Sequence, residues 1–469
     1  MRKDKEQQKK AQAIQQSMFE KAGEPLSVNT GGTGTLRSSG VELSSRLEKQ
    51  RTLTGNILEK IVDYENLKRA YKQLSANGGA SGTDGMETGE LRQWLGENLD
   101  HLRSKLLAEE YAVSAVRKVV IPKPSGGERV LGIPTVKDRF IQHAIHQELS
   151  RVYDPQFSDY SYGFRPNRSA SQAIEQAANY IKEGKEWVVD IDLENFFDRI
   201  NHDRLMQRLS KGIGDKRLLR LINAYLKAGM MEGGMAEQRT SGTPQGGPLS
   251  PLLSNVVLDE LDKELERRGH SFCRYADDCN IYVSSRKAGE RVMDSIVKFI
   301  ENKLKLRVNR VKSGVRHCSE VKFLGYTMLS GGGIRVADKS ITSLKNKVRE
   351  ITKRNRGVKF SQVIEELNTV IIGWTNYFYL ANKWLSTIRS LDEWIRRKLR
   401  CYKLKQCGRK HTIFKLLRNA GIAIASSWNV ALYAQGWWNM SKKVAVSKAL
   451  NLEWFARQGL QSMSLRMKV

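Results

Sequence analysis

Two short acidic segments constrain the fold of this 469-residue chain more than any other feature. In EWVVDIDLENFFDRI (186–200), an apolar run ends in DID at residues 190–192, which predicts a strand that carries an acid at its end. In SFCRYADDCNIYV (271–283), aromatic and β-branched residues flank YADD at residues 275–278, which predicts a hairpin with two adjacent carboxylates at its turn. The two segments therefore predict a strand and a hairpin that each carry carboxylates at a strand end or turn.

The adjacent carboxylates carry a chemical implication. Like charges side by side disfavour joint ionisation, and a divalent cation removes that penalty. Mg²⁺ prefers carboxylate oxygen, and two metal ions held by carboxylates stabilise both the attacking and the leaving oxygen of a phosphoryl transfer. An Asp pair in a turn is common by itself, but a strand-ending Asp192 about 85 residues before a YADD hairpin is far more specific. The pattern predicts a metal-dependent phosphoryl-transfer site.

The net charge of +29 indicates a polyanionic partner, because Lys and Arg that neutralise phosphates gain affinity through counterion release. Residues 341–469 hold 25 Lys and Arg against 6 Asp and Glu, which is +19 and leaves 54 against 44, or +10, for the first 340. Seven of the nine tryptophans lie in the same tail. RNA offers phosphates to pair and bases to stack, so this composition favours RNA binding. Core tryptophans beneath a solvated charged face are the alternative.

The chain divides further by pattern. Residues 1–50 pass from a charged, Gln-rich stretch into a Gly/Ser/Thr-rich one, which predicts a short helix and a flexible linker. Helical spacing begins at Leu53, and the loop NGGASGTDGM (77–86) separates this region from a second amphipathic helix. A strand hairpin with its tip at residues 125–127 follows, strands and helices then alternate to about residue 335, and the remainder is mostly helical.

Several classes of protein are excluded by composition. No apolar run approaches the ~20 residues that a membrane helix needs, and the N-terminal residues resemble neither a secretory signal nor a transit peptide. We therefore expect a cytoplasmic protein. The five cysteines form no CxxC pair and predict neither a disulfide framework nor a zinc site.

Several motifs together resemble a known family. YADD, the DxxxFFD run from Asp192, GTPQGGPLSPLLSN (242–255) and VKFLGY (321–326) resemble successive reverse transcriptase motifs, in order and at sensible separations. IPKPSGGERVLGIPTVKDR (121–139) and SYGFRPNRSA (161–170) are similar to segments of the bacterial group II intron-encoded proteins. The resemblance runs from about Leu53 to the C-terminal end, and residues 1–50 depart from it.

The resemblance implies an α+β right-hand polymerase, with fingers and palm, followed by an α-helical thumb or maturase region. Many family members continue into a His/Cys-containing endonuclease, and we expect this chain to lack one because it has neither paired CxxC motifs nor a His cluster. The implied regions are a variable extension (1–50), an N-terminal reverse transcriptase extension with the fingers (51–185), the palm with the catalytic site (186–335), the thumb or maturase region (336–425) and a basic DNA-binding region (426–469).

The resemblance also implies a catalytic site. Asp192 and Asp277 would bridge two Mg²⁺ ions and Asp278 would complete the site, while Asp190 and Asp198 are expected to be supporting acids. Phe197 would block the 2′-hydroxyl of a ribonucleotide, with core packing as the alternative. Lys312 would help to neutralise pyrophosphate, with a solvated loop lysine as the alternative. The implied dNTP-binding residues are Lys123, Arg129, Phe197, Gln245 and Lys312.

Two further sets of residues have implied roles in binding nucleic acid. Arg396, Arg397, Lys398 and Arg400 follow Trp394 on an expected helix and would form a phosphate track for RNA. Gly78, Gly79, Gly82 and Gly85 allow the loop 77–86 to approach a strand closely and would form a lid over the template, with a flexible linker as the alternative.

The implied function is that of a reverse transcriptase and intron maturase. Its partners would be a group II intron RNA whose splicing it assists, a target DNA, and the RNA template, DNA primer and dNTPs of target-primed reverse transcription. A domesticated reverse transcriptase in defence or repair is one alternative. A splicing-only RNA-binding factor is another, which the intact Asp192, Asp277 and Asp278 disfavour.

Overall fold

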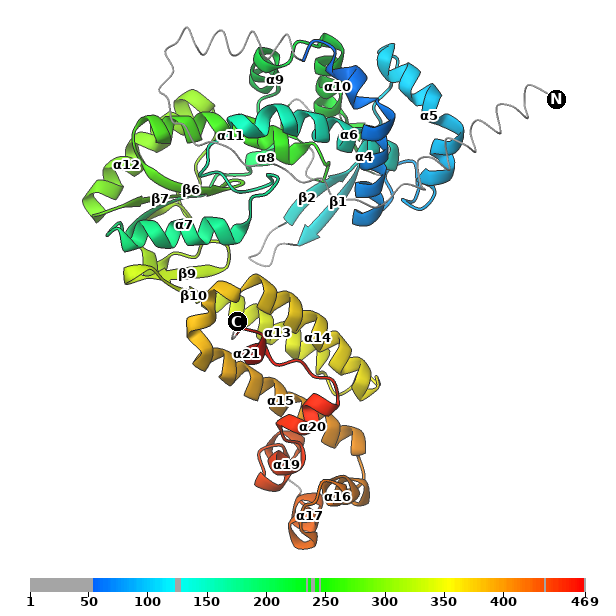
Figure 1. Ribbon diagram of the computed structural model, residues 1–469, viewed down its shortest axis with the longest axis vertical. Helices are drawn as coiled ribbons and strands as arrows, with labels where there is room; N and C mark the ends of the chain where they lie inside the picture. Colours follow the sequence, from blue (N-terminus) through cyan, green and yellow to red (C-terminus); the bar gives the residue numbers. More distant parts are fainter. Residues whose placement is uncertain are drawn as a thin grey trace, which may run out of the picture. The chain divides into compact units, whose positions relative to one another are not determined.

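The structure is a computed structural model that describes residues 54–122, 128–232, 235–237, 241–243, 246–433 and 436–467 (Figure 1). The predicted helix and linker of residues 1–50 and the predicted hairpin tip at 125–127 lie outside these ranges. The described chain forms two compact units. The first holds residues up to Ser169, Val189–Ile281 and Lys287–Val315, and the second holds Ala170–Val188, Tyr282–Arg286 and the residues from Arg316 onward.

Helices surround the sheets of the first unit. Helix α4 (Tyr64–Asn77) begins where the Asp63 side chain accepts a hydrogen bond from the Glu65 N–H, and it buries Leu67, Ala70 and Leu74 against α6 (Val136–Tyr153). The loop 77–86 connects α4 to α5, as the apolar spacing predicts. The other helices of this unit are α3 (Ile57–Ile61), α5 (Leu91–Leu107), η1 (Asp154–Gln156), α8 (Phe196–Arg199), α9 (His202–Gly212), α10 (Lys216–Lys227), α11 (Ser250–Arg267), α12 (Arg286–Phe299) and the π-helical η2 (Ile300–Leu304).

A four-stranded sheet with the order β2-β1-β4-β5 carries the basic hairpin that the sequence predicts. Strand β1 (Val116–Pro122) pairs antiparallel with β2 (Glu128–Ile133), which places Val119 opposite Leu131. Strand β1 also pairs in parallel with β4 (Met230–Glu232), which turns back into β5 (Met235–Glu237). Sequence patterns did not predict this second hairpin, because its strands have only three residues each.

A second four-stranded sheet holds both acidic segments, in the order β6-β7-β3-β8. Strand β3 (Trp187–Ile191) ends one residue before Asp192, and the β6 (Ser271–Tyr275) and β7 (Asp278–Val283) strands form the hairpin around the YADD turn. Strand β8 (Gly314–His317) completes the sheet. Because β3 and β7 are hydrogen-bonded neighbours, the fold brings the two acidic segments onto adjacent strands.

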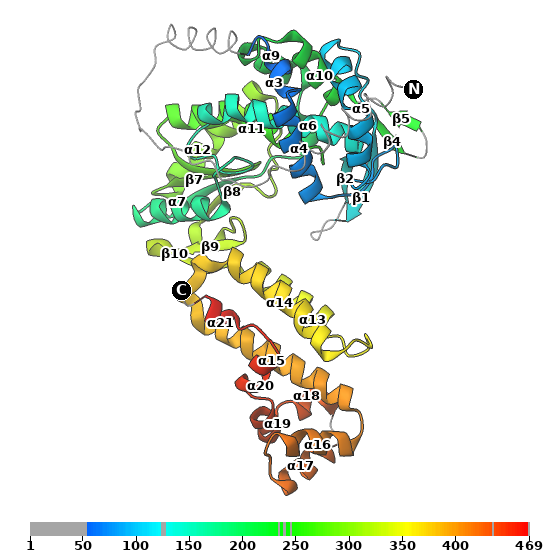
Figure 2. The ribbon, with the colours of Figure 1, turned by 45° about the vertical axis from the view of Figure 1, so that its right-hand side comes forward.

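The second unit is mainly helical beyond residue 340, as predicted (Figures 1 and 2). Helices α13 (Asp338–Ile351), α14 (Phe360–Tyr377) and α15 (Leu385–Cys407) share an apolar core that includes Val348, Leu367 and Leu399. The other elements are α7 (Ala170–Lys182), η3 (Cys318–Glu320), β9 (Tyr326–Leu329), η4 (Ser330–Gly332), β10 (Gly333–Val336), η5 (Tyr379–Trp384), α16 (Lys410–Asn419), α17 (Ile424–Ala431), α18 (Gly436–Met440), α19 (Val444–Ala449), α20 (Leu452–Arg457) and α21 (Met463–Arg466).

The observed architecture confirms the predicted fold class, a mixed α and β region followed by helices. The five predicted regions divide the chain by role, whereas the compact units divide it by packing, so those boundaries stay predictions. Across the part of the chain that the structure describes, no helix is long and apolar enough to span a membrane.

Candidate active site

Asp192 is held by the loop that follows η2. Its backbone N–H donates to Ser313 Oγ at 2.9 Å, and its carbonyl oxygen accepts from the Asn309 N–H at 2.8 Å. Its half-exposed carboxylate lies 3.5 Å from the Nζ of Lys312, a side chain that is 65% exposed. The structure thus brings two predicted site residues together and places a positive charge beside the strand-ending acid.

A buried arginine, Arg274, holds the YADD turn in place. Ala276 has a φ of 57°, a left-handed conformation that costs a non-glycine residue energy. The Arg274 guanidinium stabilises this turn, because its Nη1 donates to the Ala276 carbonyl oxygen at 2.9 Å. Gly163 lies against the same turn, and a Cβ at that position would come within 2.3 Å of the Ala276 nitrogen. The chain therefore needs a glycine there.

Arg274 itself is completely buried and fully bonded. Its Nε and Nη2 form a bidentate pair with the Asp262 carboxylate at 2.7 and 2.5 Å, and both side chains are 0% exposed. Nη1 also reaches Asn255 Oδ1 at 3.0 Å, and Nη2 reaches Ser161 Oγ at 2.7 Å. Burial alone would lower the pKa of Arg274, but the Asp262 carboxylate outweighs it and the pKa is raised.

Sequence reasoning missed this cluster. Its one signal is a charged residue in the middle of the apolar segment SFCRY, where a half-buried strand would be expected to carry apolar and small polar residues.

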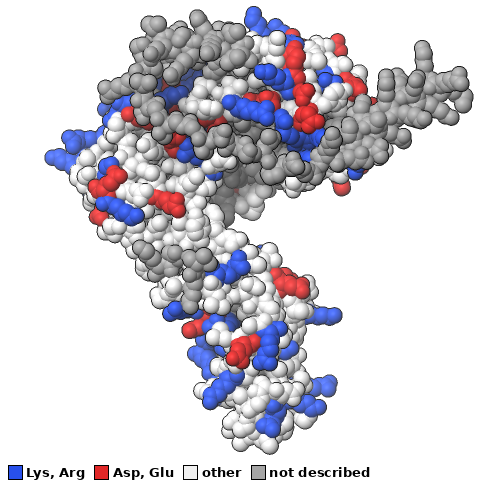
Figure 3. All heavy atoms as spheres, viewed as in Figure 1, with Lys and Arg blue, Asp and Glu red and all other residues white. Residues whose placement is uncertain are grey.

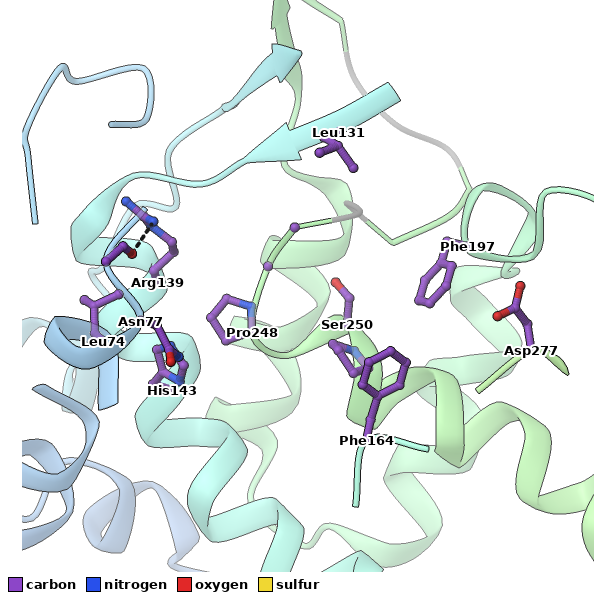
Figure 4. A pocket seen from close by; sticks show the side chains of 14 residues that line it. Leu74, Asn77, Leu131, Arg139, His143, Phe164, Phe197, Pro248, Ser250 and Asp277 are labelled. Carbon is purple, nitrogen blue, oxygen red and sulfur yellow. Dashed lines mark hydrogen bonds between the residues drawn. The ribbon is translucent and has the colours of Figure 1, made fainter. Parts of the chain in front are cut away.

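A cavity of about 500 Å³ opens beside the turn (Figure 4). Asp277, Phe197 and Phe164 line one side of it, and Arg139 and His143 of α6 lie on the other. The remaining lining residues are Leu74, Asn77, Gly78, Leu131, Gly246, Gly247, Pro248, Ser250 and Pro251. The residues that line the cavity thus come from strand β2, the turn between β6 and β7, the helices α4, α6, α8 and α11, and the loops beside them.

Residues 242–243 hold the backbone of Phe197 in the cavity wall. The Phe197 carbonyl oxygen accepts from the Thr243 N–H at 2.7 Å, and the Gly242 carbonyl oxygen lies 2.6 Å from Nε2 of the buried His202. The ring packs edge-on against Phe196 with centroids 5.3 Å apart. Phe197 thus has both features that the sequence left open, contact with the core and a place on the cavity wall.

The glycine-rich loop packs at the rim of the cavity. Arg139 Nη2 donates to the Ala80 carbonyl oxygen at 2.7 Å. A Cβ on Gly79 would come within 2.6 Å of Arg139 Nη1. A Cβ on Gly82 would come within 2.5 Å of the Thr135 backbone. Gly78 and Gly85 have positive φ and open space around them. The loop is therefore packed against α6, and its role as a template lid stays a prediction.

The structure describes some of the remaining predicted site residues and not others. Lys123 and Gln245 lie outside the described residues. Arg129 is part of β2 opposite Ile121, but its side chain is not among those described. Asp278 begins β7 directly after Asp277.

The basic residues of α15 do not share one open face. Arg397 lies over the Trp438 ring at 3.6 Å, Lys398 lies 4.9 Å from the same ring, and Arg400 Nε donates to the Leu450 carbonyl oxygen at 3.0 Å. Burial lowers the pKa of Arg397, Lys398 and Arg400. Arg396 lines a separate cavity of about 710 Å³. Their role in RNA binding stays a prediction, and part of their bonding is internal.

The carboxylates of the site fit a divalent cation only in part. Among the residues that the structure describes, no group of three or more His, Cys, Asp or Glu side chains lies close enough to hold a metal ion. Asp192 and Asp277 nevertheless supply oxygen donors, which Mg²⁺ prefers, and Asp192 already pairs with a cationic group, the Lys312 ammonium at 3.5 Å. Their metal-binding roles stay predictions.

Two protein-family models match the chain. Residues 121–328 match "Reverse transcriptase (RNA-dependent DNA polymerase)", and residues 341–420 match "Group II intron, maturase-specific domain". Members of the reverse transcriptase family generally use divalent metal ions. Both matches agree with the order of motifs in the sequence.

Two curated proteins are similar to the chain. The chain is 32% identical to protein YkfC of Escherichia coli over 58% of this chain and 82% of that protein. It is 31% identical to the group II intron-encoded protein LtrA of Lactococcus lactis subsp. cremoris, over 55% of this chain and about half (54%) of that protein.

A chain of a solved partial Cas6-RT-Cas1–Cas2 complex is more distantly similar. It has a TM-score of 0.34 and 25% identity over 53% of this chain and 43% of that chain. On the family matches and the relatives above, the chain belongs to the family of group II intron-encoded reverse transcriptases and maturases.

Proposed function

We propose that this protein is an RNA-directed DNA polymerase that binds its parent group II intron RNA, assists the splicing of that RNA and copies it by target-primed reverse transcription. The observation that carries the polymerase activity is the cavity of about 500 Å³, in which the first carboxylate of the YADD turn lies on the same wall as two aromatic rings, Phe197 and Phe164. Its sides come from elements that are far apart in sequence, so the chain builds the site by folding.

The proposed roles follow from the contacts. Asp192 and Asp277 would hold two Mg²⁺ ions, and Asp278 would complete the site. When bound, such ions stabilise charge on the attacking and leaving oxygens of a phosphoryl transfer. Lys312 would offset negative charge beside Asp192, and Phe197 would exclude a 2′-hydroxyl from the cavity.

Nucleic acid would enter the cavity from its rim. Arg139 would keep the loop 77–86 in place at that rim, where the loop would cover the template. Lys123, Arg129 and Gln245 would bind the incoming dNTP. The maturase activity rests on the matched maturase-specific region and on the +19 charge of residues 341–469.

The change Asp277→Asn tests the proposal, because it removes one charge and keeps the side-chain shape. We expect primer extension on an RNA template to fall by at least a hundredfold, while intron RNA binding and splicing assistance change little. Asp294→Asn is the matched control, since Asp294 is an exposed residue of α12. If a folded Asp277→Asn protein lost RNA binding to the same degree as extension, the two activities would share a site and the proposal would be wrong.

A further inference from the structure

One stretch of the second unit has an extreme charge pattern. Residues 394–452 hold 13 Lys and Arg and no Asp or Glu. A solvated protein face usually mixes the two signs, so an acid-free stretch of 59 residues favours a polyanionic partner. Around α16 and α17, the face visible in Figure 3 shows Lys and Arg among uncharged side chains, without acidic ones.

Helix α16 presents one mixed face of cations and aromatic rings. His411, Phe414, Lys415 and Arg418 have the spacing i, i+3, i+4, i+7, which places them on one side of the helix. Phe414 is half-buried and the other three are exposed. Arg418 donates to the Ile422 carbonyl oxygen at 2.6 Å and so also closes the turn to α17. Lys415 is exposed on the same face of α16 and can bind a phosphate directly.

Helix α17 lies beside α16 (Figures 1 and 2) and adds a tryptophan to this face. The Trp428 and Phe414 rings stack with centroids 4.3 Å apart and planes 21° from parallel. His411 lies beside both rings, 6.2 Å from Phe414 at 24° and 6.5 Å from Trp428 at 43°. Trp428 remains 37% exposed, whereas the other eight tryptophans, all within the described residues, are more covered. This ring is therefore open to a ligand and held in a fixed orientation.

An ordinary core does not account for the exposed ring. Ile424 and Leu432, each four residues from Trp428, are 58% and 56% exposed, so an apolar stripe of α17 faces outward in addition to its buried side at Val430 and Ala431. A protein partner could cover that apolar stripe, but it would leave the cations of α16 without counter-charges. An aromatic ring among phosphate-binding cations suits nucleic acid better.

We infer that the α16–α17 surface (His411, Phe414, Lys415, Arg418 and Trp428) binds an unpaired segment of RNA, with a base stacked on Trp428 and phosphates beside Lys415 and Arg418. In a duplex the neighbouring base pairs cover the base faces, so a stacking ring selects unpaired nucleotides. The choice of RNA rests on the proposed function, because the maturase-specific match extends to residue 420 and includes the α16 face. Trp428 lies beyond that match, within the region 426–469 that the family resemblance implies to bind DNA, so the test includes a DNA arm.

The full chain with Trp428→Ala tests this inference. Its binding is compared with that of the wild type for a single-stranded RNA oligonucleotide, the same RNA as a duplex, and single-stranded DNA of the same sequence. Base stacking on an aromatic ring accounts for about 5-fold to 150-fold in affinity. We expect a loss of that size on single-stranded RNA, little change on the duplex, and recovery with Trp428→Tyr.

Two further variants distinguish stacking from other causes. Ile424→Ala removes a more exposed neighbour that has no ring and should leave the affinity within about twofold of the wild type. Lys415→Gln should reduce the slope of log K against log salt by about 0.7 for a single strand. It also keeps the inference testable if Trp428→Ala lowers the melting temperature of the protein.

Three results would overturn the inference. One is an equal loss of duplex and single-strand binding in Trp428→Ala, and another is a loss confined to DNA. The third is an effect of Ile424→Ala as large as that of Trp428→Ala, which would indicate an apolar docking site for protein. Failure of the proposed function would look different, because the wild-type protein itself would then lack primer extension or intron binding.

Discussion

The buried pair beneath the YADD turn gives the sharpest prediction, namely that Asp262→Asn destabilises the first unit and its active site together. Asp262 holds Arg274 through two hydrogen bonds, and neither side chain is exposed. The substitution keeps the shape but removes the negative charge and one acceptor. The guanidinium would then be buried without its counter-charge, while its Nη1 still bonds Ala276.

The expected magnitude is large. Removing one partner of a buried ion pair costs about 3–5 kcal/mol, because the other charge stays desolvated. Unfolding free energies of whole domains are about 5–15 kcal/mol, so the change would consume a large fraction of the stability. Part of the cost should appear locally, because the left-handed Ala276 loses support and the position of Asp277 becomes less defined.

Chemical denaturation followed by circular dichroism measures the free energy of unfolding, and single-nucleotide primer extension measures the activity of the site. Glu301→Gln is the matched control, since it also turns a carboxylate that binds an arginine into an amide. Its partner Arg310 is 61% exposed and Glu301 is 36% exposed, so a loss within about 1 kcal/mol is expected. If Asp262→Asn cost no more than this control, the buried cluster would not stabilise the turn and the reasoning would be refuted.

Two more predictions concern the cavity wall. Phe197→Ala should open space beside the sugar and raise ribonucleotide incorporation relative to dNTP incorporation by at least tenfold in side-by-side extension assays; an unchanged ratio would make Phe197 a core residue only. Burial, followed by the charges of His146 and Arg139, lowers the pKa of His143 from 6.5 to about 4. Between these values the unfolded chain binds a proton that the folded chain does not, so the free energy of unfolding should fall as pH drops from about 6.5 to about 4. Denaturation at several pH values should show a shallower fall in His143→Gln, and an unchanged slope would contradict the assignment.

The local parts of the fold were predictable from the sequence because their signals are local. Alternating apolar residues on either side of a turn predicted the hairpin of β1 and β2, and a short apolar run predicted β3. The YADD hairpin followed in the same way. The β4–β5 hairpin did not, because three-residue strands carry too short a pattern for alternation to be recognised.

The support of the site was not predictable, because its partners are distant in sequence. Arg274 is bonded to Asp262, Asn255 and Ser161, which are 12, 19 and 113 residues away. Each of these residues is an ordinary polar side chain in its own segment. Only the packing of α11 beside β6 brings them to one point, where the low dielectric makes the pairing strong.

The basic tail shows why a count of charges cannot assign their roles. The sequence treats the cations of α15 and α16 alike, but Arg400 bonds the Leu450 carbonyl oxygen and Arg397 covers Trp438, so both hold the C-terminal helices to α15. Glutamate at either position would remove that support even without RNA. Weaker RNA binding could then come from the lost packing or from a lost phosphate contact. Lys415 is exposed and can be neutralised without breaking such a contact. A change in the salt dependence of RNA binding on neutralising Lys415 therefore reports a phosphate contact, whereas the same change at Arg400 does not.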